Sequence, residues 1–218
     1  MEIKRQKTRT LFTKDNGRSS DAVSPNFIYS CLGGCRESYC YVMRNHHAKK
    51  KVFINENTDQ ILSSIQDWLD ESAECKTPNQ TDPKYYTIDI GCSTDIPLMW
   101  KYYNWNYVFD WFKNHPMAKA TFATKYVQYK MLDYNPNGKI RIRFSLMPQT
   151  LSDKIEPNTS KIADRLKAIK KFYDAGYEVH LNFSPIVYYN GWLNDYRLLF
   201  QHVNCYVPEQ MRESVKSE

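Results

Sequence analysis

Three cysteines within ten residues form the part of this sequence that is best equipped for chemistry. They are Cys31, Cys35 and Cys40, in the segment CLGGCRESYCY, with Gly33 and Gly34 between the first two. Three thiolates this close can bind three irons of a [4Fe–4S] cluster and leave the fourth iron without a protein ligand. Glycine tolerates the tight bends that such a loop needs. We therefore interpret the segment as an iron–sulfur site with one open coordination position.

Structural zinc is the competing interpretation of the same cysteines. Zinc usually takes four protein ligands, often in CxxC pairs. His46 and His47 lie close enough in the sequence to supply a fourth ligand, so zinc stays open as an alternative. The spacing of the three cysteines fits no common zinc finger, which favours the cluster.

The composition indicates one folded domain. The 218 residues are 42% hydrophobic and 15% aromatic, which excludes a disordered chain and suffices for one sizeable core. No segment approaches the roughly 20 apolar residues of a membrane span, and the first residues lack the apolar core of a signal peptide. We therefore expect a cytoplasmic protein, in which a tight cysteine cluster indicates a metal or redox site. The net charge of +6 permits a polyanionic partner without requiring one.

Strands and helices alternate along the chain after a polar and basic start. Residues 1–24 are expected to be a basic N-terminal tail, and residues 25–218 a single domain. Apolar patterns predict strands over 27–29, 85–90, 120–126, 139–146 and 177–186, and helices over 58–74, 105–112, 160–175 and 192–203. Ser160 is the expected N-cap of the third helix and Gly176 its C-cap. This alternation favours an α/β fold with a parallel sheet and right-handed crossovers.

The predicted order of elements also predicts where the chemistry gathers. The cysteine loop follows the first strand, and Cys92 follows the second. In parallel α/β folds the functional loops lie at the carboxyl ends of the strands. The four cysteines should therefore share one rim of the sheet.

Several short motifs in a fixed order resemble a known family. The triplet that ends in Tyr39-Cys40-Tyr41 resembles the radical S-adenosylmethionine (SAM) superfamily, and the downstream sequence resembles the spore photoproduct lyase family within it. The likeness covers about residues 27–212. Its motifs are CSTDI (92–96), ATKY (123–126), RIRFSL (141–146), IEPNTS (155–160), AGY (175–177), SPI (184–186) and GW (191–192). The resemblance implies a partial (β/α) barrel of the radical SAM type, with about five to six parallel strands and outer helices.

The resemblance implies roles for the residues around the cysteine loop. Cys31, Cys35 and Cys40 would hold the [4Fe–4S] cluster, and SAM would bind its open iron. Tyr39 and Tyr41 would contact SAM or relay the radical back to it, because a phenol can pack, hydrogen-bond and be oxidised. Ordinary packing is the alternative role for both tyrosines.

Four residues at the ends of later strands receive roles in the same way. Cys92 matches the family cysteine that donates a hydrogen atom to the substrate radical; filling the core is its alternative role. Lys125 and Ser145 match positions that hold the amino-acid part of SAM, and Ser93 is a weaker candidate of that kind. A cation suits the SAM carboxylate, and a hydroxyl adds a hydrogen bond.

The implied function is that of a radical SAM lyase that repairs UV-induced thymine dimers in DNA. The cluster would cleave SAM to a 5′-deoxyadenosyl radical, with an external one-electron reductant such as flavodoxin or ferredoxin. Two alternatives stay open: the same chemistry on another nucleobase or a small metabolite, and a non-catalytic relative that binds metal or nucleic acid. The oligomeric state is not predicted.

Three features depart from the family pattern. The triplet reads CxxxCxxxxC where the family has CxxxCxxC, which we interpret as a longer loop that still reaches the cluster. The N-terminal extension common in the family is almost absent. The chain ends about where the sixth strand of the family would begin, before the hairpin with which the family contacts DNA.

Two arginines and one histidine lie within predicted strands. Arg141 and Arg143 alternate along one strand and therefore share a face. We expect both to be structural ion-pair partners, with DNA contact as the alternative. His180 is expected to be a hydrogen-bonded interior residue without a chemical role.

Overall fold

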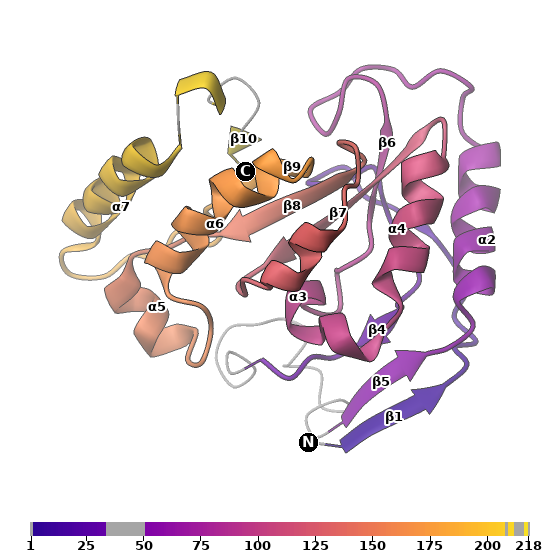
Figure 1. Ribbon diagram of the computed structural model, residues 1–218, viewed down its shortest axis with the longest axis horizontal. Coiled ribbons are helices and arrows are strands. Elements are labelled where there is room, and N and C mark those ends of the chain that lie inside the picture. The colour runs from indigo at the N-terminus through magenta and orange to yellow at the C-terminus, as the bar shows by residue number, and fades with distance from the viewer. Residues whose placement is uncertain (1, 34–50, 208, 212–215, 218) are drawn as a thin grey trace.

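The computed structural model of the protein describes residues 2–33, 51–207, 209–211 and 216–217. Its strands form a large sheet of seven strands and a small sheet of three. Helices α4 (Trp105–Asn114) and α6 (Ile162–Asp174) lie in front of the large sheet in Figure 1, while α2 (Thr58–Asp70) and α7 (Trp192–Tyr206) flank it at opposite ends. No helix in the described ranges is long and apolar enough to cross a membrane.

The large sheet confirms the predicted parallel α/β core. Its order is β10-β9-β8-β7-β6-β3-β2, and every neighbouring pair is parallel except the antiparallel pair β2–β3. The strands are β2 (Lys14–Asp15), β3 (Ala22–Val23), β6 (Tyr86–Asp89), β7 (Ala118–Thr124), β8 (Ile140–Ser145), β9 (Glu178–Asn182) and β10 (Lys216–Ser217). The sixth parallel strand is thus β10, at the position where the sequence analysis expected it to begin.

The small sheet corrects two expectations about the start of the chain. Residues 27–29 were predicted to be the first strand of the parallel sheet, but β4 (Ile28–Tyr29) pairs antiparallel with β5 (Lys51–Asn55), which also pairs in parallel with β1 (Glu2–Gln6). The first parallel strand of the large sheet is β3, whose two residues are too few to show an alternating pattern. The segment 1–24, expected to be a tail, therefore contains three strands.

The predicted helices are present, with small differences at their ends. The helix predicted over 58–74 ends at Asp70. Gly176 follows α6 with φ of +90°, as a C-terminal glycine should. Ser160 is not the N-cap: α6 begins at Ile162 after Lys161, and the Ser160 hydroxyl accepts a 3.0 Å hydrogen bond from the Val127 N–H. Short helices α3 (Ile96–Met99) and α5 (Gln149–Ile155) complete the described crossovers.

The two faces of the large sheet differ in chemistry because side chains alternate along each strand. Apolar positions face the helices and form the core, among them Ile88, Ala120, Phe122, Ile142 and Val179. The alternate positions on the opposite face are polar yet buried: Thr87, Asp89, Lys119, Thr121, Arg141, Arg143, Ser145 and His180. This polar face, opposite the helices, is called the inner face below. Because its charged side chains are buried, they need partners of opposite charge within the protein.

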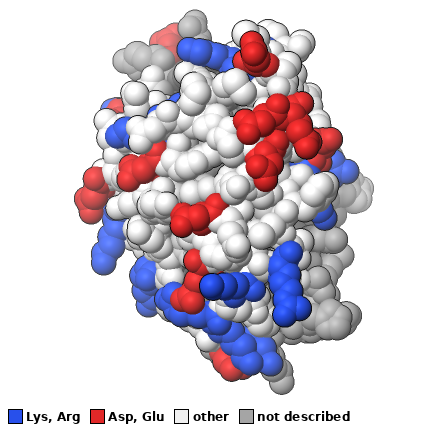
Figure 2. Space-filling view, turned by 90° about the vertical axis from the view of Figure 1, so that its right-hand side faces the viewer, with Lys and Arg blue, Asp and Glu red and all other residues white. Residues whose placement is uncertain are grey.

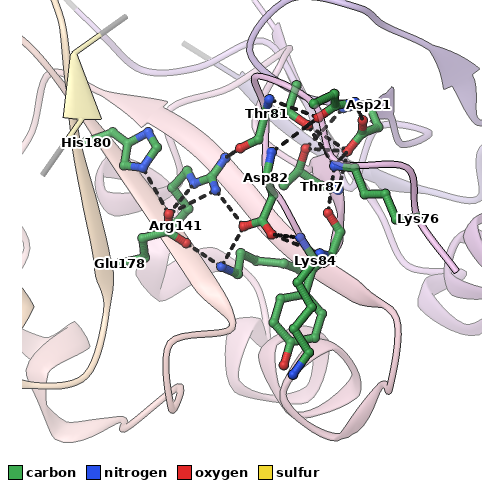
Figure 3. A network of polar contacts seen from close by, with 12 residues as sticks. Asp21, Lys76, Thr81, Asp82, Lys84, Thr87, Arg141, Glu178 and His180 are labelled. Atoms are coloured by element: carbon green, nitrogen blue, oxygen red, sulfur yellow. Dashed lines mark hydrogen bonds and ion pairs between the residues drawn. The ribbon is translucent and has the colours of Figure 1, made fainter. Parts of the chain in front are cut away.

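Ion pairs provide that neutralisation, as Figure 3 shows. Arg141, which is fully buried, bonds Asp82 at 2.9 Å and Glu178 at 3.0 Å, and its third contact is the Thr81 carbonyl at 2.7 Å. The imidazole of His180 lies 2.9 Å from Glu178. The predicted ion-pair role of Arg141 and the interior position of His180 are confirmed.

Candidate active site

Cys31 is the one predicted cluster ligand within the described residues. It follows β4 immediately after Ser30, which adopts a left-handed backbone with φ of +73°. The residue is 6% exposed, and its sulfur accepts a 3.4 Å hydrogen bond from the Gly33 N–H. Backbone N–H groups directed at sulfur are one of the devices by which proteins tune iron–sulfur clusters. The local geometry of Cys31 therefore fits a ligand sulfur.

The remaining loop residues with predicted roles lie outside the described residues. They are the ligands Cys35 and Cys40 and the tyrosines Tyr39 and Tyr41, together with the zinc alternatives His46 and His47. Within the described ranges, no group of three or more His, Cys, Asp or Glu side chains could hold a metal ion. A metal centre at Cys31 would therefore need ligands from outside the described residues.

The loop after β6 contacts the backbone that leads into Cys31. The Thr94 hydroxyl donates a 2.9 Å hydrogen bond to the carbonyl oxygen of Ser30. Both groups are buried, so water competes little for either one. This hydrogen bond thus joins the segments that carry Cys31 and Cys92, which agrees with the prediction that the two segments lie close together.

Asp95 joins the same loop to the end of β7. Its carboxylate accepts hydrogen bonds from the Thr124 hydroxyl and the Lys125 N–H, both at 2.8 Å, and caps α3 through the Leu98 N–H at 3.3 Å. Burial raises the pKa of Asp95, against the lowering effect of these donors. An Asp one residue before Ile96-Pro97 is a readable N-cap signal, but sequence reasoning assigned Asp95 no role.

Lys125 and Ser145 lie at the carboxyl ends of neighbouring strands, as predicted, and one buried ion pair contacts both. Glu156 bonds Arg165 at 3.0 Å, with both side chains fully buried, and lies 4.0 Å from the Lys125 ammonium. Arg165 also donates to the Ser145 carbonyl at 2.7 Å. The pair therefore fixes the ends of β7 and β8 relative to each other. Sequence patterns gave no signal for the role of Arg165, because a single arginine in an amphipathic helix is usually exposed.

Cys92 lies on an exposed part of the turn that follows β6, and Ser93 beside it is half-buried. The core-filling alternative for Cys92 is therefore wrong. Partial desolvation of the sulfur raises the pKa of the Cys92 thiol, the nearby Asp89 carboxylate raises it further, and Arg143 opposes both effects. Arg143 itself pairs with Asp89 at 2.6 Å, which confirms its predicted ion-pair role.

The described site residues thus form one connected rim. Hydrogen bonds and ion pairs run from Ser30 through Thr94 and Asp95 to the end of β7, and from there through Glu156 and Arg165 to the end of β8. A parallel sheet whose strand ends carry an exposed thiol and a cation, next to a buried sulfur that follows a strand of the small sheet, has the architecture of a partial (β/α) barrel of the radical SAM type.

The family follows from comparison with known sequences. A family model described as Spore photoproduct lyase matches residues 7–218. The match spans almost the whole chain, and the protein belongs to the spore photoproduct lyase family.

Individual relatives agree with this assignment. The spore photoproduct lyase of Bacillus subtilis is 26% identical over 206 residues, and that of a Geobacillus strain is 28% identical over 197 residues. These alignments cover 94% and 89% of this chain but 57% and 54% of the relatives. The chain therefore spans little more than half the length of the curated relatives it matches.

Solved structures show the same fold. A spore photoproduct lyase complexed with dinucleoside spore photoproduct matches 95% of this chain and 58% of its own length, with a TM-score of 0.82 and 25% identity. A variant with bound AdoMet and dinucleoside spore photoproduct has a TM-score of 0.84 at 24% identity and covers 99% of this chain.

Proposed function

We propose that this protein is a radical SAM lyase that acts on UV-induced thymine dimers in DNA. The observation that supports the proposal is the connected rim, because hydrogen bonds and ion pairs link the segment of Cys31 to the ends of the large-sheet strands that precede Cys92, Lys125 and Ser145. Family membership adds the chemistry, since the relatives are named spore photoproduct lyases.

The proposed cofactors are a [4Fe–4S] cluster and SAM. When bound, they would supply a 5′-deoxyadenosyl radical, given one electron from an external reductant such as flavodoxin or ferredoxin. Cys31, with its buried sulfur and its Gly33 N–H contact, would be one of the three ligands, and Cys35 and Cys40 the others. Three ligands leave one iron open.

Lys125, Ser145 and Ser93 would hold the amino-acid part of SAM, and Tyr39 or Tyr41 would contact it or return the radical to it. The Lys125 ammonium is half-buried and would face the SAM carboxylate, where partial burial strengthens a charge-assisted contact. Glu156 keeps this cation at the rim, and the buried position of Ser145 limits competition from water.

Cys92 would donate a hydrogen atom to the thymine radical left after the dimer is split. The step transfers one hydrogen atom from sulfur to carbon, forms a C–H bond, and leaves a thiyl radical that takes a hydrogen atom back from Tyr39 or Tyr41. The exposed position of Cys92 suits this role, because a donor must reach its substrate.

A polyanionic substrate suits the charge distribution near the site. Lys4 and Arg5 are exposed on β1, and Lys7 and Arg9 follow it. Strand β1 belongs to the same small sheet as β4, the strand that leads into Cys31. Figure 2 shows Lys and Arg side chains gathered on the lower part of one face and acidic side chains on its upper part. Basic side chains of this kind would bind DNA phosphates in a salt-dependent manner.

The test is a repair assay with anaerobically reconstituted protein, SAM, reductant and DNA that carries the spore photoproduct. The wild type is expected to restore thymine and to release less 5′-deoxyadenosine than thymine, because return of the radical re-forms SAM. Cys92→Ala should still release 5′-deoxyadenosine but lose most thymine recovery, whereas Cys75→Ala, at an exposed cysteine away from the rim, should behave as wild type.

Other outcomes of this assay would reject the proposal in distinct ways. Release of 5′-deoxyadenosine without thymine recovery by the wild type would indicate radical SAM chemistry on another substrate. Zinc without iron, together with no cleavage of SAM, would leave a non-catalytic metal- or nucleic-acid-binding protein.

A further inference from the structure

The turn that carries Cys92 is held by a single carboxylate. Asp89, the last residue of β6, accepts a 2.8 Å hydrogen bond from the Gly91 N–H through Oδ1. Its other oxygen, Oδ2, accepts a 2.6 Å bond from Arg143 Nη2 on the inner face of β8. Asp89 is 7% exposed and Arg143 4% exposed. The carboxylate therefore bridges the Cys92 turn and a strand two places away in the sheet.

Close packing holds the turn from its other sides. A Cβ atom at Gly91 would lie 2.6 Å from Phe122 Cβ on β7, so the backbone runs against that strand at a distance only glycine allows. Two residues after Cys92, the Thr94 hydroxyl bonds the Ser30 carbonyl. The Cys92 backbone is thus fixed on both sides, which limits how far its sulfur can move from the Asp89–Arg143 pair.

The charged groups around the sulfur come from two strands. Among the described residues, Asp89 acts from the end of β6 and Arg143 from β8. The neighbouring elements offer uncharged contacts to the turn: the Phe122 side chain from β7 and the Ser30 carbonyl from the loop after β4. Within the described residues, the charge balance at Cys92 therefore depends on Asp89 and Arg143, which are paired with each other.

A hydrogen-atom donor must carry its hydrogen. A thiolate has no S–H bond to give, so a donor cysteine works only in its protonated form, in contrast to a nucleophilic cysteine, which works as the thiolate. A carboxylate near sulfur favours the thiol by repelling a second negative charge, and a guanidinium has the opposite effect.

We propose that the Asp89–Arg143 ion pair is a positioning device for Cys92, in which Asp89 orients the turn and disfavours a negative charge on the sulfur, while Arg143 holds the Asp89 carboxylate in place. This assignment rests on the proposed hydrogen-donor role of Cys92. The direction of the pKa shift agrees: burial and Asp89 both raise the pKa of the Cys92 thiol, and Arg143 lowers it.

Substitutions of Asp89 and Arg143 should shift the pKa of Cys92 in opposite directions. A role of the ion pair in folding alone would not produce opposite shifts. In Asp89→Asn the amide oxygen still accepts from the Gly91 N–H, but the negative charge is lost, so the pKa of Cys92 should fall. In Arg143→Gln the carboxylate loses its counter-charge, so the pKa of Cys92 should rise. We expect each shift to be about 0.5 pH unit or more.

The experiment measures the alkylation rate of Cys92 by iodoacetamide as a function of pH on the full chain, with peptide mass spectrometry to separate the cysteines. Cys75 and Cys205, both exposed, are internal references whose profiles should not move. Arg5→Gln, which removes the 3.1 Å surface pair with Glu56, is the matched control and should leave the Cys92 profile unchanged.

Shifts of the Cys92 alkylation profile in opposite directions in the two variants would support the proposed role of the Asp89–Arg143 pair. Shifts in the same direction, as loosening of the turn would cause, or no shift in either variant, would overturn it. The readout requires neither SAM cleavage nor DNA. Unshifted profiles in a protein that repairs DNA would therefore reject only this inference, and shifted profiles in a protein that does not would reject only the proposed function.

Discussion

The hydroxyl of Thr94 donates a 2.9 Å hydrogen bond to the carbonyl oxygen of Ser30, the residue directly before Cys31. This bond joins the two sheets of the protein at the point where the proposed cluster ligand begins. It crosses 64 residues of sequence and lies between two buried groups. The position of Cys31 relative to Cys92 therefore depends on it.

Thr94→Val removes this hydroxyl while it preserves the shape of the side chain. We expect a loss of about 1 kcal/mol in the free energy of unfolding, because the buried Ser30 carbonyl loses the hydrogen bond from Thr94. A cluster at Cys31 should be held about tenfold less tightly, as is usual when an outer contact of a metal ligand is removed. Iron retained after a chelator challenge measures the second effect.

Thr121→Val is the matched control for that experiment. The Thr121 hydroxyl is buried and has no hydrogen-bond partner among the described residues, so its removal should be neutral or slightly stabilising and should leave iron retention unchanged. Equal behaviour of the two variants would show that the Thr94 bond does not support the site.

Glu156→Gln tests the buried ion pair behind Lys125 and Ser145. The substitution leaves Arg165 as a buried charge without a counter-ion, which should cost about 3–5 kcal/mol in urea unfolding. Asp153→Asn is the control, because the Asp153–Lys161 pair at 2.6 Å belongs to the same region but is about half exposed on both sides. The control should leave the unfolding free energy nearly unchanged. A small effect of Glu156→Gln would contradict the role of this pair.

Lys125→Met tests the proposed contact with the carboxylate of SAM. We expect the KM for SAM in the cleavage reaction to rise by about 10- to 100-fold, as the loss of a charge-assisted hydrogen bond predicts. Lys130→Met removes an exposed lysine on the following turn and should leave the KM unchanged. If the two variants had the same KM, SAM would bind elsewhere.

Acid should destabilise the protein by protonating Glu178, which is paired with basic side chains on the inner face of the large sheet. Burial alone would raise the pKa of Glu178, but His180, Arg141 and Lys119 outweigh it and hold the pKa well below 4.5. A carboxylate whose pKa is lowered by folding adds stability above its unfolded pKa, and this stability is lost as the pH falls below that value. Stability should therefore fall steadily as the pH drops below about 4.5.

Glu178→Gln should lower stability at pH 7 and make the fall in acid shallower, because the titrating group is gone. Urea unfolding midpoints between pH 7 and pH 3 measure both effects, with Glu74→Gln, at an exposed position, as the reference. A variant whose midpoints fell in parallel with those of the wild type would place the acid sensitivity elsewhere.

The sequence predicted the helices and strands that have a periodic apolar pattern and missed the elements too short to have one. Periodic apolar residues marked α2, α4, α6 and the strands β6 to β9, because burial on one face imposes a period. Strand β3 has two residues, too few for any period, so the apolar residues 27–29 predicted the first parallel strand instead. A strand this short is recognised only by its pairing with neighbouring strands, and the local sequence does not reveal that pairing.

The candidate site divides in the same way. Cysteine spacing and the family motifs pointed to Cys31, Cys92, Lys125 and Ser145 because those residue types are rare or chemically distinctive at strand ends. The groups that position them were missed. Arg165 resembles any helix arginine in sequence, and only the fold shows that it is fully buried against Glu156 and the Ser145 carbonyl. Such contacts depend on long-range packing.

The most direct test of the whole account is the iron content and SAM cleavage of the anaerobically reconstituted protein. We predict about four irons per chain and release of 5′-deoxyadenosine by the wild type and by Cys205→Ala, which changes an exposed cysteine, and the loss of both in Cys40→Ala. One equivalent of zinc without iron in the wild type, or undiminished cleavage of SAM by Cys40→Ala, would contradict the account.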